Sequence, residues 1–389
     1  MSSFWLTEEQ EAIREGVARV CSNYGDDYWL RTDDTGKFPE DFVADMAAGG
    51  WLGVAMPESV GGAGLGLTEA AVVMQTVSQS GAGFSGASSI HLNIFGPMPL
   101  VKFGTDAQRE KLLPRIIAGE DKMCFAVTEP NSGLDTSSLE TKAERTNDGY
   151  LINGRKIWTT GAQRANKILI IARTTPKDQV AKPTQGLSLF YTDLNREHID
   201  AKPIPKMGRR AVECNTLFID NLRVPEEDLV GEEGKGFQYL LHGLNPERVL
   251  FGVEAVGLGR AALARAATYA NERVVFGRPI GQNQGIQHPL AERWVELEAA
   301  ELLVLRAAAA YDSGEESGAF ANAAKYYAGE AGHRACETAM LTHGGMGYAK
   351  EFHVERYFRE AQIARIAPVM AQLILSHIGE RVLGLPKSY

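Results

Sequence analysis

The chain has 389 residues, of which 44% are hydrophobic, and this is enough for one large domain or for two to three smaller ones with packed cores. A formal net charge of −9 argues against a nucleic-acid partner, because binding a phosphate backbone calls for clustered cations. The four cysteines form no CxxC pair and the eight histidines form no HExxH motif, so neither a disulfide nor a metal site is expected.

The amino terminus lacks the features of a signal or transit peptide. Residues Met1–Gln10 contain no basic region and turn acidic at once. No apolar run approaches the roughly 20 residues that a membrane span requires. Widely spaced cysteines are typical of reduced thiols, so a cytoplasmic protein without a membrane partner is expected.

The first part of the chain, to about residue 122, is predicted to be helical. Thr7 and Gln10 have the spacing of a capping box that opens a helix. The glycine-rich segment 61–66 lacks the Lys-Ser/Thr that follows a phosphate-binding loop, so a turn is expected there. The helices expected in this part run from Thr7 toward Tyr24 and over Phe38–Ala48, Thr68–Gln79 and Asp106–Ala118.

From Met123 to about Val230 the pattern of apolar residues has a period of two, which indicates β-strands. Asn147-Asp148-Gly149 and Asn153-Gly154 contain residues that tolerate the positive φ angles of tight turns, so a hairpin and then a second turn are expected. The expected strands are Ala143–Thr146, Tyr150–Ile152, Arg155–Trp158, Lys167–Arg173, Leu187–Thr192 and Thr216–Ile219.

This β region also predicts a ligand site. Val127–Pro130 leads into a polar loop that ends near Asp135, and the sheet would bring this loop close to the strand end Trp158–Thr160. An aromatic plate with hydroxyls beside it suits a flat ligand with polar edges. The alternative is a structural β-meander in which the tryptophan belongs to the core.

From Gly236 onward the chain is predicted to be helical again and to form a bundle. The segment 257–262 fits a loose GxGxxA dinucleotide fingerprint, but it lies inside a predicted helix with no strand before it, so close helix packing is expected instead. One apolar stripe near the 3.6-residue period comprises Leu290, Trp294, Leu297, Val304 and Ala308. The expected helices are Pro246–Arg273, His288–Asp312, Ala319–His343 and Pro368–Leu383, with a shorter one around Val354–Arg365.

Several short motifs follow one another in a set order: Met56-Pro57-Glu58, Gly61-Gly62, Phe103-Gly104-Thr105, Leu113-Pro114, Thr128-Glu129-Pro130, Trp158-Thr159-Thr160, Glu272–Gly277 and Gly344–Tyr348. In these motifs and in its order of elements, essentially the whole chain resembles the acyl-CoA dehydrogenase family. The resemblance implies an α+β fold that is mainly α. It divides the chain into an N-terminal helical domain (1–122), a middle domain like a β-barrel or sandwich (123–235) and a C-terminal four-helix bundle (236–389).

The resemblance also implies FAD as cofactor, and its position in the chain. Within one subunit it assigns the isoalloxazine and phosphate contacts to Phe125, Val127, Thr128, Gly133, Trp158 and Thr160, with the Thr160 hydroxyl near the flavin N5. For the remaining cofactor contacts it implicates Arg273, Phe276 and Gln284 of a neighbouring subunit, together with Gly344, Gly345 and Gln372. FAD binding would then require a dimer, and a homotetramer built as a dimer of dimers is expected.

Two positions depart from the family pattern. In the loop, family members usually carry Ser or Thr at the position where this chain has Leu134. Far along the chain, they usually carry Gln at the position where this chain has Leu341. Each change removes a polar contact worth on the order of 1 kcal/mol. FAD or the CoA substrate is therefore expected to be held differently at these points, with Leu134 on the substrate side.

The catalytic base is the most diagnostic residue. Most members of the family place a Glu at the start of the last helix, where this chain has Pro368. Isovaleryl- and long-chain-type members take the base from the first bundle helix just before an Arg, and here Glu247 precedes Arg248. A Glu beside an Arg is more often a solvated helix start, but the absence of a carboxylate at 368 favours Glu247 as base, with a pKa raised by its apolar pocket.

The same comparison assigns the substrate contacts. Arg248 resembles the substrate-side Arg of the family, and Asn245 is expected along the pantetheine. Pro368 is expected to open the last helix beside the thioester. Proline has no N–H to donate to the thioester oxygen, so Val369 N–H, a flavin hydroxyl alone or a different chemistry would have to serve.

The expected activity is FAD-dependent α,β-dehydrogenation of an acyl-CoA to the 2-enoyl-CoA, in fatty acid or amino acid catabolism, with electrons passed to an electron-transferring flavoprotein. One alternative is an oxidase-type reaction on acyl-CoA in the same flavin site. Another is a non-catalytic or DNA-associated flavoprotein of the superfamily. The position of the base favours branched or long acyl chains, and the sequence does not define the chain further.

Overall fold

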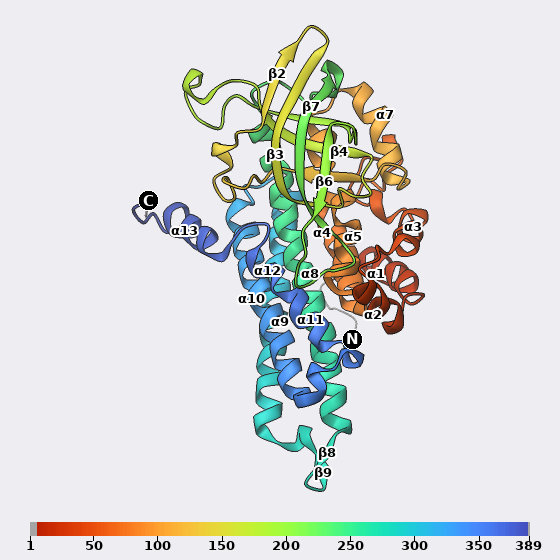
Figure 1. Cartoon of the computed structure of the whole chain (residues 1–389). Coiled ribbons are helices and arrows are strands. Elements are labelled where there is room, and N and C mark those ends of the chain that lie inside the picture. The colour runs from red at the N-terminus through yellow and green to blue at the C-terminus, as the bar shows by residue number, and fades with distance from the viewer. Residues whose placement is uncertain (1–5, 388–389) are drawn as a thin grey trace.

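The computed structural model describes residues 6–387 and has a helical N-terminal part, a β domain and a long C-terminal helical bundle (Figure 1). The β domain lies at one end of the bundle, and the N-terminal helices pack along the side of the bundle close to it (Figure 1). The predicted α+β class with mainly helical content is confirmed.

Seven α-helices form the N-terminal part of the chain as described from residue 6 onward. Thr7 caps the first helix as predicted, because its hydroxyl accepts from the Gln10 amide and the Gln10 side chain accepts from the Thr7 amide. Sequence analysis missed α2, α5 and α6. Every residue of α5 except Leu92 is buried, so this helix shows no polar face and no amphipathic period. The helices are α1 Glu8–Cys21, α2 Asp26–Thr35, α3 Glu40–Ala48, α4 Leu67–Val77, α5 Gly83–Phe95, α6 Met98–Phe103 and α7 Asp106–Ile117.

The β domain is built on one seven-stranded sheet in the order β1-β4-β2-β3-β7-β6, with β5 paired to β4. The hairpin between β2 and β3 is confirmed, but the second turn at Asn153-Gly154 is wrong. These residues lie within the continuous strand β3, where the pairing register with β7 shifts. Glycine suits position 154 because a Cβ there would lie 2.5 Å from the Thr141 hydroxyl. The strands are β1 Met123–Ala126, β2 Lys142–Thr146, β3 Gly149–Thr160, β4 Lys167–Arg173, β5 Leu187–Asp193, β6 Ile199–Pro203 and β7 Cys214–Pro225.

The C-terminal part is helical apart from a short hairpin at its far end. Two predicted helix starts are wrong. The first long helix, α8, begins at Gly236 and contains Pro246, and the last helix, α13, begins at Ala371 and not at Pro368. The elements are α8 Gly236–Glu272, β8 Val274–Val275, β9 Arg278–Pro279, α9 Gln284–Asp312, α10 Gly318–His343, α11 Val354–Ala361, α12 Ile363–Ile366 and α13 Ala371–Arg381.

Short helical turns connect these elements. One is a π-helical turn, Ser78–Ala82, and the others are 3-10 turns at Trp51–Gly53, Glu58–Val60, Thr136–Ser138, Lys177–Gln179, Glu226–Asp228, Ile280–Gln282, Gly344–Tyr348 and Lys350–Phe352. The glycine-rich segment 61–66 forms a turn as expected, and Gly61 and Gly64 have positive φ angles there.

The helix α8 is the centre of the packing, with α9 and α10 on one side and α4 and α5 on another. Its two glycines in the GxGxxA segment allow this close approach. A Cβ on Gly257 would lie 2.7 Å from the Gln75 carbonyl oxygen, and one on Gly259 would lie 2.7 Å from Leu297. The prediction that this segment serves helix packing is confirmed.

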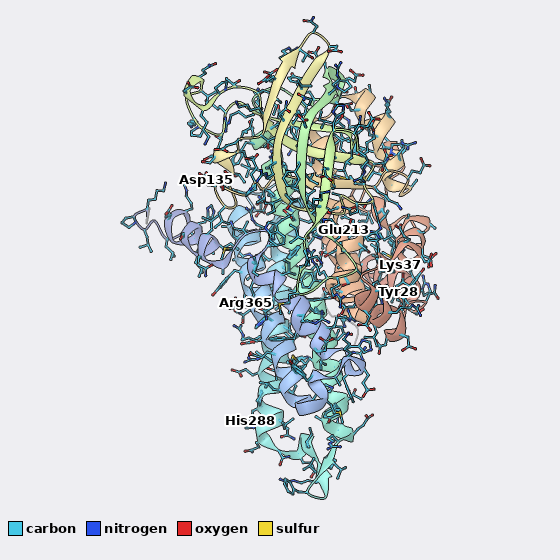
Figure 2. The ribbon with its side chains drawn as sticks, viewed as in Figure 1. Tyr28, Lys37, Asp135, Glu213, His288 and Arg365 are labelled. Atoms are coloured by element: carbon cyan, nitrogen blue, oxygen red, sulfur yellow. The ribbon has the colours of Figure 1, made fainter. Side chains whose placement is uncertain are left out.

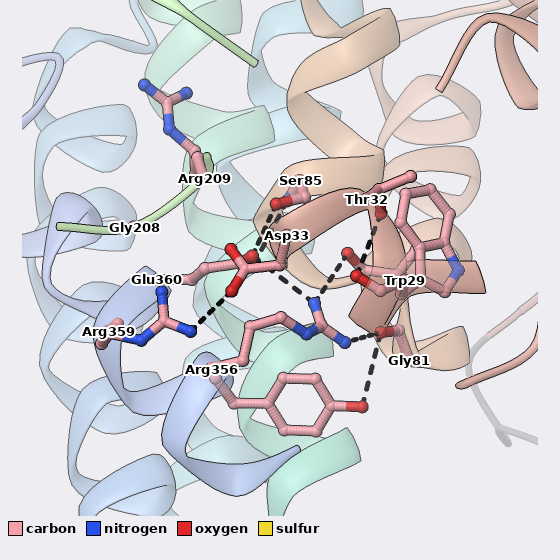
Figure 3. A network of polar contacts seen from close by, with 12 residues as sticks. Trp29, Thr32, Asp33, Gly81, Ser85, Gly208, Arg209, Arg356, Arg359 and Glu360 are labelled. Carbon is pink, nitrogen blue, oxygen red and sulfur yellow. Dashed lines mark hydrogen bonds and ion pairs between the residues drawn. The ribbon is translucent and has the colours of Figure 1, made fainter. Parts of the chain in front are cut away.

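A buried polar network fixes α5 against the carboxy-terminal helices (Figure 3). Glu360 on α11 accepts hydrogen bonds from the backbone amide and the hydroxyl of Ser85, at 3.2 and 2.6 Å. Arg356, one turn earlier, donates to the Gly81 carbonyl at 2.6 Å. Arg359 pairs with Asp33 of α2 at 2.7 Å. These contacts join α2, the turn before α5 and the start of α5 to α11.

One helical stretch, Val354–Arg381, is long and apolar enough to cross a membrane by length and composition alone, and such a stretch is weak evidence for a span. It comprises α11, α12 and α13, and residues 367–370 separate the last two of these helices. The sequence analysis had expected no run of this kind.

Candidate active site

The two predicted ligand-binding segments of the β domain lie side by side. The amide of Ile157 on β3 donates a hydrogen bond to the carbonyl oxygen of Thr128 at 2.9 Å. The Lys156 ammonium reaches under the loop and donates to the Val127 carbonyl at 3.0 Å. The expectation that the sheet brings the Thr128 loop to the Trp158 strand end is therefore confirmed.

A buried ion pair holds this loop, and sequence analysis did not identify it. Lys156 Nζ lies 2.9 Å from Glu129 Oε1, and both side chains are buried. The Glu129 carboxylate also accepts from the amides of Glu140 and Thr141, at 2.7 and 3.0 Å. Burial lowers the pKa of Lys156 to about 8, although Glu129 opposes this shift. Burial would raise the pKa of Glu129, but Lys156 and the hydrogen bonds hold it below its usual value.

Trp158 is an open aromatic surface and not a core residue. Its φ angle of 61° falls within a register shift between Lys156 and Thr159, and its side chain is 54% exposed. The alternative of a β-meander with a core tryptophan is therefore wrong. Thr128 and Thr160 beside it are partly buried; the Thr160 hydroxyl lies 3.5 Å from Cys214 Sγ, and the Thr128 hydroxyl has no hydrogen-bond partner among residues 6–387. Together with the partly buried Phe125 and Val127, these residues fit a flat ring system with polar edges, such as the flavin of FAD.

Glu247 is a partly buried carboxylate on α8 with a strongly shifted pKa. Burial raises the pKa of Glu247 to about 7, and the nearby His91 and Arg248 reduce this shift. Arg248 donates to the Asn245 side chain at 2.7 Å, while its Nε is buried without a partner among the described residues. A carboxylate that titrates near neutral pH is suited to general base catalysis.

The segment 366–370 is anchored to the bundle close to Glu247. Lys325 of α10 is buried and donates to the Val369 carbonyl at 2.5 Å, and its charge also acts on Glu247. Burial lowers the pKa of Lys325 to about 8. Pro368 is partly buried in this segment and precedes α13, so the expectation that it opens that helix is wrong.

The remaining predicted cofactor residues do not join this site within one chain. Arg273, Phe276 and Gln284 are exposed around the β8–β9 hairpin, at the opposite end of the bundle from the β domain (Figure 1). The Phe276 side chain is fully exposed. Gly344 and Gly345 are also exposed, and a Cβ on either would meet nothing within 4 Å.

The last predicted residues lie on the surface nearer the β domain. Gly133 and Leu134 are exposed in the loop that contains Asp135, which Figure 2 shows where the β domain meets the bundle, far from His288 on α9. Gln372 is exposed on α13. Leu341, a departure from the family pattern, is instead at the other end of the bundle, near the end of α10, and it is 75% exposed.

Two residues near Glu247 were not identified from sequence. His91 of α5 and Glu254 of α8 form a buried pair, with 2.5 Å between Nδ1 and Oε1. Glu254 lies seven residues after Glu247, a spacing that places both on the same side of a helix. His91 could not be placed because α5 itself was not predicted.

Comparison with known families explains this arrangement. Models of the N-terminal, middle and C-terminal domains of acyl-CoA dehydrogenase match residues 7–120, 124–222 and 234–383. The chain belongs to the acyl-CoA dehydrogenase family. It is therefore an oxidoreductase, and FAD, to which the open tryptophan and its hydroxyls are suited, is its cofactor.

Individual relatives cover nearly the whole chain. The acyl-CoA dehydrogenase FadE12 of Mycobacterium tuberculosis is 36% identical over 100% of this chain and 99% of its own length. The caffeyl-CoA reductase-Etf complex subunit CarC of Acetobacterium woodii is 35% identical over 86% of this chain and 87% of its own. The structure of butyryl-CoA dehydrogenase from Megasphaera elsdenii matches with a TM-score of 0.93 and 28% identity, over 98% of this chain and 100% of the other.

Proposed function

We propose that the protein dehydrogenates an acyl-CoA thioester between Cα and Cβ, with Glu247 as the base that removes the α-proton. The observation that supports this most directly is the Glu247 carboxylate, whose pKa burial raises to about 7. The position at which most family members carry the base has no carboxylate here, since segment 366–370 contains neither Asp nor Glu. Lys325 contacts the Val369 carbonyl and acts electrostatically on Glu247, and this supports a short distance between the two alternative positions of the base.

The physical state of Glu247 suits this role. With a pKa near 7 a large fraction of the side chain is ionised at neutral pH, and it is a stronger base than an ordinary carboxylate. A thioester that fills the site would exclude water and strengthen the basicity of the carboxylate further. Arg248, whose buried Nε has no partner among residues 6–387, is available to a polar group of the substrate, and Asn245 orients it.

The residues that would hold FAD fall into two groups. The flavin would contact Phe125, Val127, Thr128, Trp158 and Thr160, with Gly133 toward the phosphates. Bound FAD supplies the acceptor for the β-hydride. Because Arg273, Phe276, Gln284, Gly344, Gly345 and Gln372 are exposed in one chain, and the β8–β9 hairpin is remote from the β domain, we assign their cofactor contacts to a homo-oligomer that is a dimer of dimers.

The thioester oxygen needs a hydrogen-bond donor as enolate charge develops. Pro368 has no N–H, so we propose that the neighbouring Val369 amide or a hydroxyl of the cofactor serves instead. The anchoring of the Val369 carbonyl by Lys325 would fix that amide in place. Leu134 would line the substrate side of the loop.

We further propose an electron-transferring flavoprotein as the electron acceptor and a cytoplasmic location. The name of the related CarC subunit includes an Etf complex, which supports such a partner for this chain. The oxidase-type alternative would differ in passing electrons to O₂. The net charge of −9 disfavours the DNA-associated alternative.

The test is anaerobic flavin reduction by a panel of straight, branched and aromatic acyl-CoAs. Wild-type enzyme should bleach with at least one of them. Glu247→Gln should retain FAD and acyl-CoA binding but reduce its flavin several orders of magnitude more slowly, more than the ~10²–10⁴ of ordinary acid–base assistance, because the closed site admits no solvent base. Glu247→Asp should keep partial activity.

The control is Glu110→Gln, which neutralises an exposed glutamate on α7 and should behave as wild type. A Glu247→Gln flavin that is reduced at nearly the wild-type rate would mean that the base lies elsewhere. Oxygen consumption as fast as turnover with the flavoprotein acceptor would instead favour the oxidase-type reaction.

A further inference from the structure

Arg209 is a buried arginine to which the proposed reaction gives no role. It lies in the loop between β6 and β7, and the residue is only 9% exposed. Figure 3 shows its side chain turned away from the network that contains Arg356 and Glu360. The guanidinium donates to the Ser88 hydroxyl of α5 at 2.8 Å and to Cys214 Sγ, at the start of β7, at 3.7 Å. It therefore joins the β domain to α5 through a hydroxyl and a sulfur atom.

The charge of Arg209 is not balanced by a paired acid. Among residues 6–387, no carboxylate lies within 4.0 Å of its guanidinium. Glu213 and Glu360, whose charges act on Lys206 of the same loop, each pair with another arginine, at 3.1 and 3.4 Å. Burial, and after it the charge of Arg209, lowers the pKa of Lys206 to about 8. A guanidinium stays protonated in proteins, so this loop carries a buried positive charge that lacks a counter-charge.

Two sets of contacts place this guanidinium beside the proposed flavin-binding surface. Within the β domain, Cys214 Sγ lies 3.5 Å from the Thr160 hydroxyl, so two contacts of 3.7 and 3.5 Å separate the guanidinium from that hydroxyl. On α5, Leu92 lies one turn after Ser88, and a Cβ on Gly161 would lie 4.0 Å from Leu92 Cδ1. The charge therefore lies next to the strand end that would contact the flavin.

The proposed reaction creates the negative charge that is missing here. The α-proton of the thioester goes to Glu247, and the hydride from Cβ brings two electrons and one proton to the oxidised flavin. The flavin ring thereby gains one negative charge. A fixed cation nearby stabilises this reduced anion relative to the neutral oxidised ring, and it does so more strongly in a partly buried site than in water.

We propose that the charge of Arg209 stabilises the reduced flavin and so raises the reduction potential of the bound cofactor. This inference rests on the proposed function, which places the flavin against Thr160. Arg209 acts on the cofactor through its charge and does not touch the reacting atoms. A purely structural role, as the link between the β domain and α5, would contribute to stability but would leave the potential unchanged.

The experiment measures the midpoint potential of the bound flavin by reductive titration against reference dyes, without any acyl-CoA. Arg209→Met removes the charge and keeps a long side chain. It should lower the potential by roughly 30 mV, which is a tenfold change in the equilibrium constant of a two-electron couple. This size is expected because two unit charges roughly 10 Å apart in a partly buried setting change an equilibrium constant about tenfold. Arg209→Lys keeps the charge and should retain most of the wild-type potential.

A matched pair of variants at Ser88 tests the charge without removing Arg209. Ser88→Asp places a carboxylate beside the guanidinium and balances it, so the potential should fall as in Arg209→Met, even if that variant does not fold. Ser88→Asn has nearly the same size without the charge and should keep the wild-type potential. Arg210→Met, which removes an exposed neighbouring cation, is a further control and should also leave the potential unchanged.

Two results would overturn the inference. A wild-type potential in both Arg209→Met and Ser88→Asp, whatever their unfolding midpoints, would assign Arg209 to packing alone. Equal shifts in Ser88→Asp and Ser88→Asn would show that the shape of the site, and not its charge, sets the potential. Failure of every acyl-CoA to reduce the wild-type flavin would overturn the proposed function, whereas the titration without acyl-CoA would still decide the role of Arg209.

Discussion

Glu247 combines partial burial with cationic neighbours, and its ionisation should govern the rate of the proposed reaction. Burial favours the neutral carboxylic acid, whereas His91 and Arg248 favour the carboxylate, and the balance raises the pKa to about 7. Glu254 raises this pKa further and Lys325 lowers it. The same five side chains therefore define both the base and its electrostatic environment.

The reductive half-reaction should depend on pH in one direction. Only the carboxylate form of Glu247 accepts the α-proton, so the rate of flavin reduction should rise with pH up to about 7 and level off above it. Well below that value the rate should fall about tenfold for each pH unit, since the fraction of carboxylate falls by this factor. Stopped-flow reduction with a saturating acyl-CoA measures the profile. A rate that stays constant from roughly pH 5.5 to 8.5 would contradict the role of Glu247.

At the scale of the elements, β3 is joined to the loop with which it would form the proposed flavin-binding surface. Its residue Lys156 is buried against Glu129, and this contact joins the strand to the loop that contains Thr128. Removing one member of a buried ion pair leaves the other as an uncompensated charge, at a cost of about 3–5 kcal/mol. The loop and the strand end are therefore expected to lose their alignment together.

Lys156→Met should lower the thermal unfolding midpoint and the FAD content of the purified protein. The double variant Glu129→Gln/Lys156→Met should lose less of both, because it leaves no buried charge. Flavin absorbance per protein and the unfolding midpoint measure these effects. If the single and double variants lose equal amounts, the charge of Glu129 is not the cause and side-chain packing alone explains the loss.

The elements also show which features sequence can predict. Capping residues, hairpin turns and long amphipathic stripes are local, and Thr7, the β2–β3 turn and most of α9 were predicted from them. The helix α5 was missed because burial on all sides removes the periodic signal. Asn153-Gly154 was misread because the same dipeptide serves a close approach to Thr141 within a continuous strand.

In the candidate site, too, residues could be predicted from local sequence patterns, whereas the contacts that depend on the tertiary fold could not. Resemblance located Glu247, and the structure adds the burial that shifts its pKa. The His91–Glu254 pair depends on the packing of α5 on α8, which no local pattern contains. The contact of Lys325 with Val369 likewise joins residues from distant parts of the chain. Residue types were thus accessible from sequence, whereas their tertiary partners were not.

At the scale of the whole molecule, the predicted cofactor residues of a single chain lie mainly in two groups that are far apart. One group surrounds Trp158 in the β domain, and another includes the β8–β9 hairpin at the opposite end of the bundle (Figure 1). Exposed apolar side chains accompany the second group, including Val274, Val275, Phe276 and Tyr348. Such a concentration of apolar surface is typical of a subunit interface. A second copy that covers this end could therefore bring the hairpin to its partner's cofactor.

This arrangement predicts that Arg273→Ala weakens FAD retention more than it weakens folding. Arg273 is exposed within one chain, so its loss should leave the unfolding midpoint of the FAD-free protein within a few degrees of wild type. A guanidinium that contacts phosphate makes strong charge-assisted hydrogen bonds, so the flavin-to-protein ratio after gel filtration should fall clearly below that of wild type. Arg223→Ala, which removes an exposed arginine on β7, is the matched control and should retain its flavin. The same column reports the oligomeric state. A monomer that binds FAD stoichiometrically, or an Arg273→Ala protein with full flavin content, would show that the cofactor site is complete within one chain.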